Sequence, residues 1–89
     1  MLTERENILI ECLVKDYISK GNAISSDRLL DKTGLNCSTA TIRKDLIKLE
    51  SLGLVESTHV SSGRLPTVKG YRYYIDNNLS YIYMHLYDT

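Results

Sequence analysis

The stretch from Ser38 to Gly53, STATIRKDLIKLESLG, decides the fold of this chain. Ser38 suits the N-cap of a helix, because its hydroxyl can accept a free backbone N–H of the first turn. Gly53 suits the left-handed position just beyond the helix end. At about 100° per residue, apolar residues fall on one face of the helix, and small or cationic residues fall on the opposite one. The apolar face consists of Ile42, Leu46 and Leu49, and the opposite face of Ala40, Lys44, Lys48 and Ser51.

The first turn of this helix has short side chains, Thr39, Ala40 and Thr41, which leave room for another molecule to approach the backbone. Arg43 flanks this turn. Short residues and cations on the outer side of an anchored helix are typical of a DNA-recognition helix. The alternative is a solvated surface helix whose lysines only face water. The neighbouring segments decide between the two.

A short helix and a tight turn precede this stretch. Ser25 or Ser26 can cap a helix that contains Leu29, and Gly34 ends that helix in the left-handed conformation. Three residues then separate Gly34 from Ser38. A short helix, a tight turn with a glycine and a capped second helix together predict a helix-turn-helix.

Two short segments with strand-forming residues, 54–58 and 64–67, follow the recognition helix and flank the loop 59–63. They predict a β-hairpin, with Pro66 at an edge or a strand end because proline lacks a backbone N–H. A hairpin in this place is the wing of a winged domain. Arg64 can set its guanidinium against the sugar-phosphate backbone or into the minor groove; the alternative is an ordinary surface arginine beside a turn.

The N-terminal segment predicts a scaffold helix from about Glu4 to Lys20. Thr3 and Glu6 form a capping box that opens it, and Gly21 stops it. Its expected apolar arc is Leu9, Ile10, Cys12, Leu13, Val14, Tyr17 and Ile18, and its expected outer side is Glu4, Glu6, Glu11 and Asp16.

Thr67 can cap a last helix from Val68 to about Asn77. We expect Tyr71, Tyr74 and Ile75 to return to the core, and Arg72 and Tyr73 to point elsewhere. The apolar tail after it could pack on the first helix, form an edge strand or meet a second copy, and we expect a homodimer. The predicted fold is thus mainly α with a small β-hairpin: a winged helix-turn-helix DNA-binding domain over residues 1–78, followed by an apolar packing or dimerisation tail over residues 79–89.

The composition describes one globular domain with a small core, because 89 residues with 43% hydrophobic and 25% charged residues leave no room for a second. No apolar run approaches the roughly 18 residues that span a bilayer, and acidic residues occupy the start, so we expect a cytoplasmic protein without membrane contact. Cys12 and Cys37 are expected to be reduced thiols, Cys12 in the core. Neither lies at zinc-ligand spacing from a histidine, and no metal or cofactor is expected.

The charges add up to zero, which argues against a nucleic-acid binder until their distribution is considered. Residues 1–31 carry four cations and six anions, whereas residues 32–75 carry seven cations and three anions. The basic middle can therefore form a basic face. The chain offers neither paired carboxylates at a pocket, nor a phosphate-binding glycine loop, nor a nucleophile with an ordered base, so it is not expected to be an enzyme.

Three stretches resemble one known family: LTERENIL at 2–9, STATIRKDLIKLESLGLVE at 38–56 and HVSSGRLPTVKGYRYYID at 59–76, the last being the most specific. Over residues 2–76 the chain is similar to the N-terminal winged-helix domain of the heat-inducible transcription repressor HrcA. Val60, Ser62 and Lys44 depart from the family pattern, Lys44 within the recognition helix. The family's ligand-sensing and dimerisation portion is not in the chain, which leaves an excised domain, a truncated member or a stand-alone relative.

The resemblance implies a repressor of chaperone genes that binds an inverted repeat upstream of heat-shock operons and that, in full-length relatives, depends on the chaperonin GroEL. We expect sequence-specific binding of double-stranded DNA, with Arg43 as the best candidate for reading guanine. Base edges or nearby phosphates are the expected contacts of Thr39, Thr41, Arg43 and Lys44. The DNA backbone is the expected contact of Lys48, Arg64, Lys69 and Arg72. Further DNA contacts are expected from Ser38, His59, Ser61 and Ser62. The alternative is a winged-helix protein-protein interaction module without DNA binding, which the neutral charge, an exposed Ile47 and the apolar tail would suit.

Overall fold

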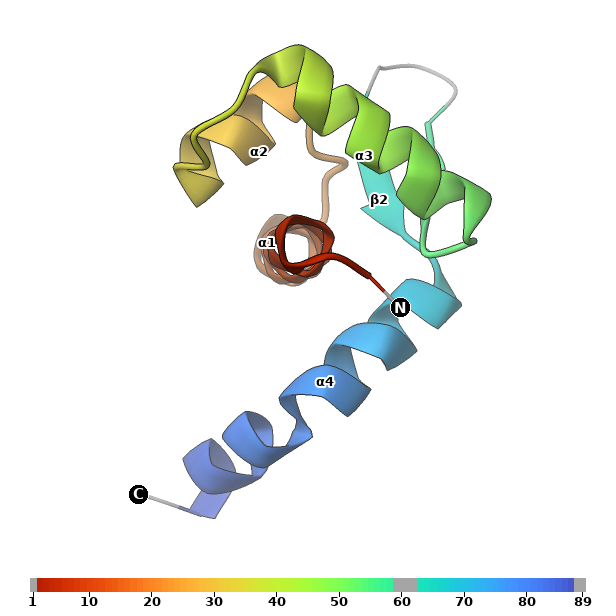
Figure 1. The fold of residues 1–89 in the computed structure, drawn as a ribbon. Coiled ribbons are helices and arrows are strands. Elements are labelled where there is room, and N and C mark those ends of the chain that lie inside the picture. The colour runs from red at the N-terminus through yellow and green to blue at the C-terminus, as the bar shows by residue number, and fades with distance from the viewer. Residues whose placement is uncertain (1, 59–62, 88–89) are drawn as a thin grey trace.

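Four helices and a two-stranded antiparallel hairpin make up the computed structural model, which describes residues 2–58 and 63–87, with side chains up to residue 78. In chain order the elements are α1 (Glu4–Lys20), α2 (Ser26–Thr33), α3 (Thr39–Ser51), β1 (Val55–Ser57), β2 (Arg64–Pro66) and α4 (Val68–Tyr87) (Figure 1). This architecture confirms the predicted winged helix-turn-helix.

The ends of the helices follow from local hydrogen bonds. At α1 the Thr3 backbone N–H donates to Glu6 Oε1 at 2.8 Å, and the Glu6 N–H donates to Thr3 Oγ1 at 3.1 Å, which confirms the capping box. At α3 the Thr41 N–H donates to Ser38 Oγ at 3.2 Å. Gly53 has φ +76°, the left-handed conformation predicted for the end of this helix.

The helix-turn-helix consists of α2, a short turn and α3. Ser25 caps α2, because its hydroxyl oxygen accepts the Arg28 N–H at 3.1 Å. Gly34 ends the helix with φ +64°, a backbone conformation that residues other than glycine rarely adopt. The two helices are tied at their N-terminal ends, because the Thr39 hydroxyl donates to Asp27 Oδ1 at 3.0 Å. This bond joins the first turn of α3 to the first turn of α2.

The hairpin pairs Val55 with Pro66 and Ser57 with Arg64. On the other side of β2, Ile24 and Arg64 exchange two backbone hydrogen bonds of 2.9 Å each. Ile24 lies 40 positions from Arg64, so no local pattern in the sequence indicates this bridge. The loop before α2 is therefore joined to the base of the wing.

The core lies where α1, α3 and the hairpin meet. The predicted inner faces of α1 and α3 are confirmed in their central residues, which are at most 2% exposed. These are Leu9, Ile10, Leu13 and Val14 of α1 and Ile42, Leu46 and Leu49 of α3, joined by Ile24, Leu29 and Val55.

Three expectations for α1 were wrong. Ile18 is 62% exposed, since the last turn of the helix lies beyond the core. Glu6 and Asp16 are buried instead of facing outward, because cations from other helices reach them: Lys48 for Glu6 and Lys32 for Asp16. Cys12, expected in the core, is half-buried and packs against the core's edge.

The last helix begins as predicted, with Thr67 Oγ1 accepting the Gly70 N–H at 3.0 Å. Its inward side differs in two residues from the expectation. The Tyr73 hydroxyl turns inward and donates to Asn7 Oδ1 at 2.6 Å, whereas Ile75 is 45% exposed. The rotation of α4 about its own axis explains why Tyr73 turns inward and Ile75 outward. Gly70 packs closely against the Leu54 backbone, and residue 75 then falls on the outer side of the helix.

Instead of ending near Asn77, α4 continues without interruption to Tyr87 and runs away from the other elements (Figure 1). The predicted boundary at residue 78 thus falls inside one helix, and of the three alternatives for the tail the edge strand is excluded over residues 79–87. Within the described part of the chain, no helix is long and apolar enough to cross a membrane.

Candidate nucleic-acid interface

The outer side of α3 presents two unopposed cations. Arg43 and Lys44 are exposed, and neither makes an ion pair or side-chain hydrogen bond within the described residues. Ala40 and Ile47 lie beside them, Ile47 with 60% of its surface exposed. This surface, called the α3 outer face below, consists of Ala40, Arg43, Lys44 and Ile47.

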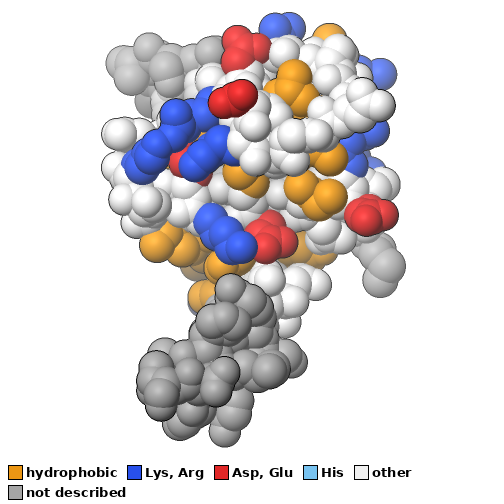
Figure 2. Space-filling model, turned by 90° about the vertical axis from the view of Figure 1, so that its left-hand side faces the viewer, with side chains coloured by type: hydrophobic (Ala, Val, Ile, Leu, Met, Phe, Trp, Pro, Cys, Tyr) orange, Lys and Arg blue, Asp and Glu red, His pale blue; other side chains and the backbone are white. Residues whose placement is uncertain are grey.

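Most other cationic side chains of the described residues form ion pairs or hydrogen bonds within the domain. Arg5 is bidentate to Asp45 at 2.5 and 3.1 Å, and Asp16 receives both Lys32 at 2.8 Å and Arg28 at 3.6 Å. Figure 2 looks at the side where α2 lies in Figure 1, and there Lys and Arg side chains alternate with acidic ones. That side is a mixed surface, whereas the α3 outer face has cations without acidic neighbours in contact.

Lys48, predicted as a contact to the DNA backbone, forms an ion pair with another residue of the domain. Its ammonium lies 3.0 Å from Glu6 Oε2, and the Glu6 side chain is only 4% exposed. The Thr3 backbone N–H first, and Lys48 with it, hold the pKa of Glu6 below its ordinary value. Lys48 therefore joins α3 to the start of α1, and its contact with DNA stays a prediction.

Arg64 also differs from the expected wing arginine, because its side chain is 16% exposed and lies against α3. Its Nε donates to Glu50 Oε1 at 3.2 Å, and the same carboxylate accepts the Ser57 hydroxyl at 3.0 Å. Glu50 thus holds both strands of the hairpin. Sequence reasoning missed this residue, because 14 positions separate Glu50 from Arg64 and no local pattern relates them.

The remaining predicted contacts are distributed around α3. Lys69 donates from Nζ to the Leu52 carbonyl at 2.8 Å, so it closes the C-terminal end of α3. Arg72 is exposed on α4 and makes no ion pair or side-chain hydrogen bond with the described residues. Ser38 and Thr41 face each other, with 3.1 Å between their hydroxyl oxygens. His59, Ser61 and Ser62 lie outside the described residues.

A cavity of about 240 Å³ connects the α3 outer face with the base of the wing. Its lining brings Arg43 and Ile47 of α3 together with Arg64 of β2 and the N-terminal end of α2. Thr39, predicted to contact DNA, lines this cavity, and its hydroxyl donates a hydrogen bond to the Asp27 carboxylate. The structure therefore brings Arg43, Thr39 and Arg64 to one place and separates them from Lys48.

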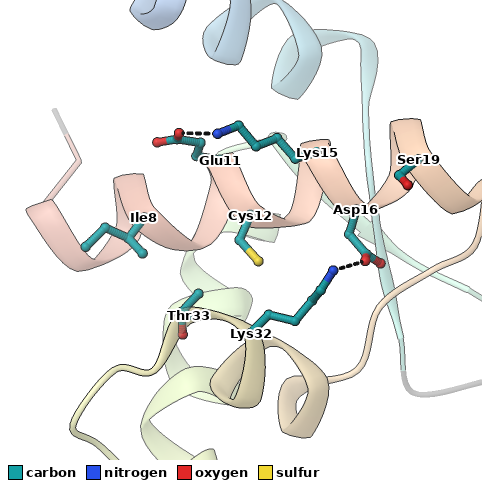
Figure 3. Close-up of a pocket in the computed structure, with 8 residues that line it drawn as sticks. All are labelled: Ile8, Glu11, Cys12, Lys15, Asp16, Ser19, Lys32 and Thr33. Atoms are coloured by element: carbon teal, nitrogen blue, oxygen red, sulfur yellow. Dashed lines mark hydrogen bonds and ion pairs between the residues drawn. The ribbon is translucent and has the colours of Figure 1, made fainter.

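A second cavity, of about 390 Å³, lies between α1 and the C-terminal end of α2 (Figure 3). Glu11 pairs with Lys15 at 2.9 Å on one side and Asp16 with Lys32 on the other, and the Cys12 sulfur points into the space toward α2. Burial raises the pKa of the Cys12 thiol. This cavity shares no lining residue with the one beside α3.

The helix-turn-helix, its exposed α3 and the adjoining hairpin define the chain as a winged helix-turn-helix domain. It belongs to the family of DeoR-like helix-turn-helix domains, which matches residues 5–62.

Among known proteins, the heat-inducible transcription repressor HrcA of Pediococcus pentosaceus is 48% identical over 80 residues, which cover 90% of this chain and 23% of that protein. The HrcA of Bacillus pumilus is 44% identical with the same coverage. A crystal structure described as a hypothetical protein superimposes with a TM-score of 0.85 at 40% identity and covers 90% of this chain and 25% of its own. The resemblance to HrcA is confirmed, and the chain spans about a quarter of the length of these relatives.

Proposed function

We propose that this domain binds double-stranded DNA sequence-specifically and represses transcription, with the α3 outer face in the major groove. The free cations Arg43 and Lys44 carry this proposal. A protein that binds DNA gains affinity by replacing counterions of the phosphates with its own cations, which must not be neutralised internally. The two relatives are named as heat-inducible transcription repressors, which supports heat-shock genes as the targets.

Within residues 1–78, which we propose as the DNA-binding unit, Arg43 and Lys44 take different tasks. Arg43 lies at the cavity beside the wing, where its guanidinium can donate two hydrogen bonds to a guanine edge. Lys44, as a point charge on the outer side, suits a phosphate. Ile47 between them supplies an apolar contact of the kind that thymine methyl groups make.

The operator is proposed to be an inverted repeat read by two copies, because two-fold DNA sites match two-fold protein dimers. The chaperonin GroEL is proposed as a partner for the longer relatives, of which this chain spans about a quarter.

Fluorescence anisotropy with a labelled inverted-repeat duplex and a scrambled duplex, across a salt series, tests the proposal. Arg43→Ala should lose about 1–3 kcal/mol of preference for the repeat, roughly 5- to 150-fold. Lys44→Ala should weaken both duplexes alike and reduce the log-log salt slope by about 1. Lys15→Ala, which removes a cation at the cavity between α1 and α2, is the matched control and should leave both duplexes unaffected.

Equal losses of Arg43→Ala on both duplexes would contradict its role in base reading. No binding to either duplex at low salt would contradict the whole proposal and would favour the alternative, a protein-interaction module that uses the exposed Ile47.

A further inference from the structure

Two ion pairs of crossed sign join the start of α1 to the middle of α3. Arg5 of α1 donates to both carboxylate oxygens of Asp45, at 2.5 Å from Nε and 3.1 Å from Nη2. The next residue of α1, Glu6, pairs at 3.0 Å with Lys48, which lies three positions further along α3. Moving α3 by one turn would place Lys48 opposite Arg5, and like charges in contact are unfavourable. The crossed pairs therefore select one register between the two helices.

The carboxylate of Asp45 depends on Arg5. Its side chain is 10% exposed, and Arg5 is its one ion-pair partner among the residues that the structure describes. A carboxylate removed from water is costly unless it is paired, so Asp45 stays where both hydrogen bonds can form. The apolar contacts of the core are non-directional, whereas the fork of a bidentate arginine fixes distance and angle. The rotation of α3 about its axis is thus tied to Arg5.

Rotation of α3 matters most for Arg43. At about 100° per residue, Arg43 lies about 200° around the helix from Asp45, so one residue faces α1 and the other the cavity beside the wing. Turning the helix by about 10° moves an atom about 6 Å from the axis by roughly 1 Å. Hydrogen bonds tolerate little change in distance and angle, and a bidentate contact to a base edge needs two of them at once.

We propose that Arg5 is a positioning residue for DNA reading. Through its two hydrogen bonds to Asp45 it fixes the rotation of α3, and with it the place of Arg43 in the major groove. Arg5 acts through α3, without contact to DNA. This role rests on the proposed function, and it gives a residue of the scaffold helix α1 an effect on sequence preference.

Arg5→Lys tests this role, because lysine keeps the charge that neutralises Asp45 but lacks the planar fork. Fluorescence anisotropy should show the preference for the inverted repeat over the scrambled duplex reduced by about 2- to 30-fold. Affinity for the scrambled duplex and the log-log salt slope should stay unchanged, since no cation is lost. Unchanged preference would overturn the proposal. Equal weakening of both duplexes would overturn it too, because that result indicates a phosphate contact.

Arg28→Lys is the matched control. Arg28 is 42% exposed, against 45% for Arg5, and also pairs with a buried aspartate, but its partner Asp16 belongs to α1 and not to α3. The control should keep the wild-type preference, and an equal loss in both variants would overturn the proposal. Circular dichroism melting of each variant, with binding measured well below the melting temperature, confirms that folded protein is compared.

A double-mutant cycle tests whether Arg5 acts through Arg43. In the Arg43→Ala background, Arg5→Lys should cause little further loss of preference, because the side chain that it positions is gone. Losses that multiply in full would overturn the proposed route through Arg43.

Measurements without DNA separate this proposal from the proposed function. In ¹H–¹⁵N spectra, Arg5→Lys should shift the backbone amides of Ala40, Arg43 and Ile47, and Arg28→Lys should not. Unchanged amides would overturn the link from Arg5 to the α3 outer face. Shifted amides together with a wild type that prefers neither duplex would uphold this link and refute the proposed function. A wild-type preference that Arg5→Lys leaves intact would refute the positioning role alone.

Discussion

Replacing Gly70 with alanine has two effects on the stability of the fold, and they have opposite signs. A Cβ at this residue would lie 2.1 Å from the Leu54 carbonyl oxygen and 3.1 Å from its carbon, whereas real Cβ contacts essentially never fall below 3.0 Å. The helix or the neighbouring backbone must therefore move by roughly 1 Å, and overpacking of this kind costs about 1–3 kcal/mol, occasionally more. Alanine in turn favours the helix over glycine by about 1 kcal/mol.

Because the obstacle is backbone and cannot rotate away, we expect the steric cost to reach or exceed the upper end of that range, with a net loss of about 2 kcal/mol. For a domain of this size, the melting temperature should fall by roughly 8–16 °C. Thermal unfolding followed by circular dichroism measures the shift, with Arg72→Ala on the exposed side of α4 as the control for a change to alanine in this helix. A melting temperature at or above the wild-type value would refute the reasoning.

Two further predictions concern the ion pairs around α3. Lys48→Met should destabilise the domain by about 1 kcal/mol at neutral pH with little change in DNA affinity. Because the pKa of Glu6 is lowered in the fold, the stability it contributes is complete above its ordinary pKa and is lost as the pH falls through the lowered one, so the melting temperatures of variant and wild type should converge in acid. Equal weakening of both duplexes, with a log-log salt slope reduced by about 1, would show that Lys48 contacts DNA. Glu50→Gln should release Arg64 from its counter-charge and steepen the salt dependence of DNA binding by at most about 1 in log-log slope. An unchanged slope would show that the other contacts of Arg64 keep it from DNA.

The features that sequence reasoning predicted correctly depend on residues three or four positions apart. The Thr3–Glu6 capping box, the Ser38 cap and the left-handed Gly34 are of this kind, because each hydrogen bond or backbone conformation is decided within one helical turn. The apolar face of α3 follows from the same periodicity. Fold class could thus be inferred without knowledge of how the helices cross.

The errors concern contacts between distant segments. Glu6 looks like an outward acid on a helical wheel, and only the placement of α3 brings Lys48 within 3.0 Å of it. The bridge from Ile24 to Arg64 spans 40 residues and has no local signal. Ile75 was assigned to the core by its apolar character, but the close approach of Gly70 to Leu54 sets the rotation of α4 and turns Ile75 outward.

The zero net charge of the chain is compatible with DNA binding because the anions of α3 are neutralised from outside the helix. Asp45 is paired with Arg5 of α1, and Glu50 with Arg64 of β2. At physiological salt, exposed charges act over about 8 Å, so an approaching phosphate responds to the charges of the nearest surface more than to the total. On the α3 outer face these are Arg43 and Lys44, whose own helix offers them no unpaired acid among the described residues. In the proposed function, Arg5 of α1 and Arg64 of β2 therefore favour DNA binding by neutralising acidic residues of α3 that would otherwise oppose it.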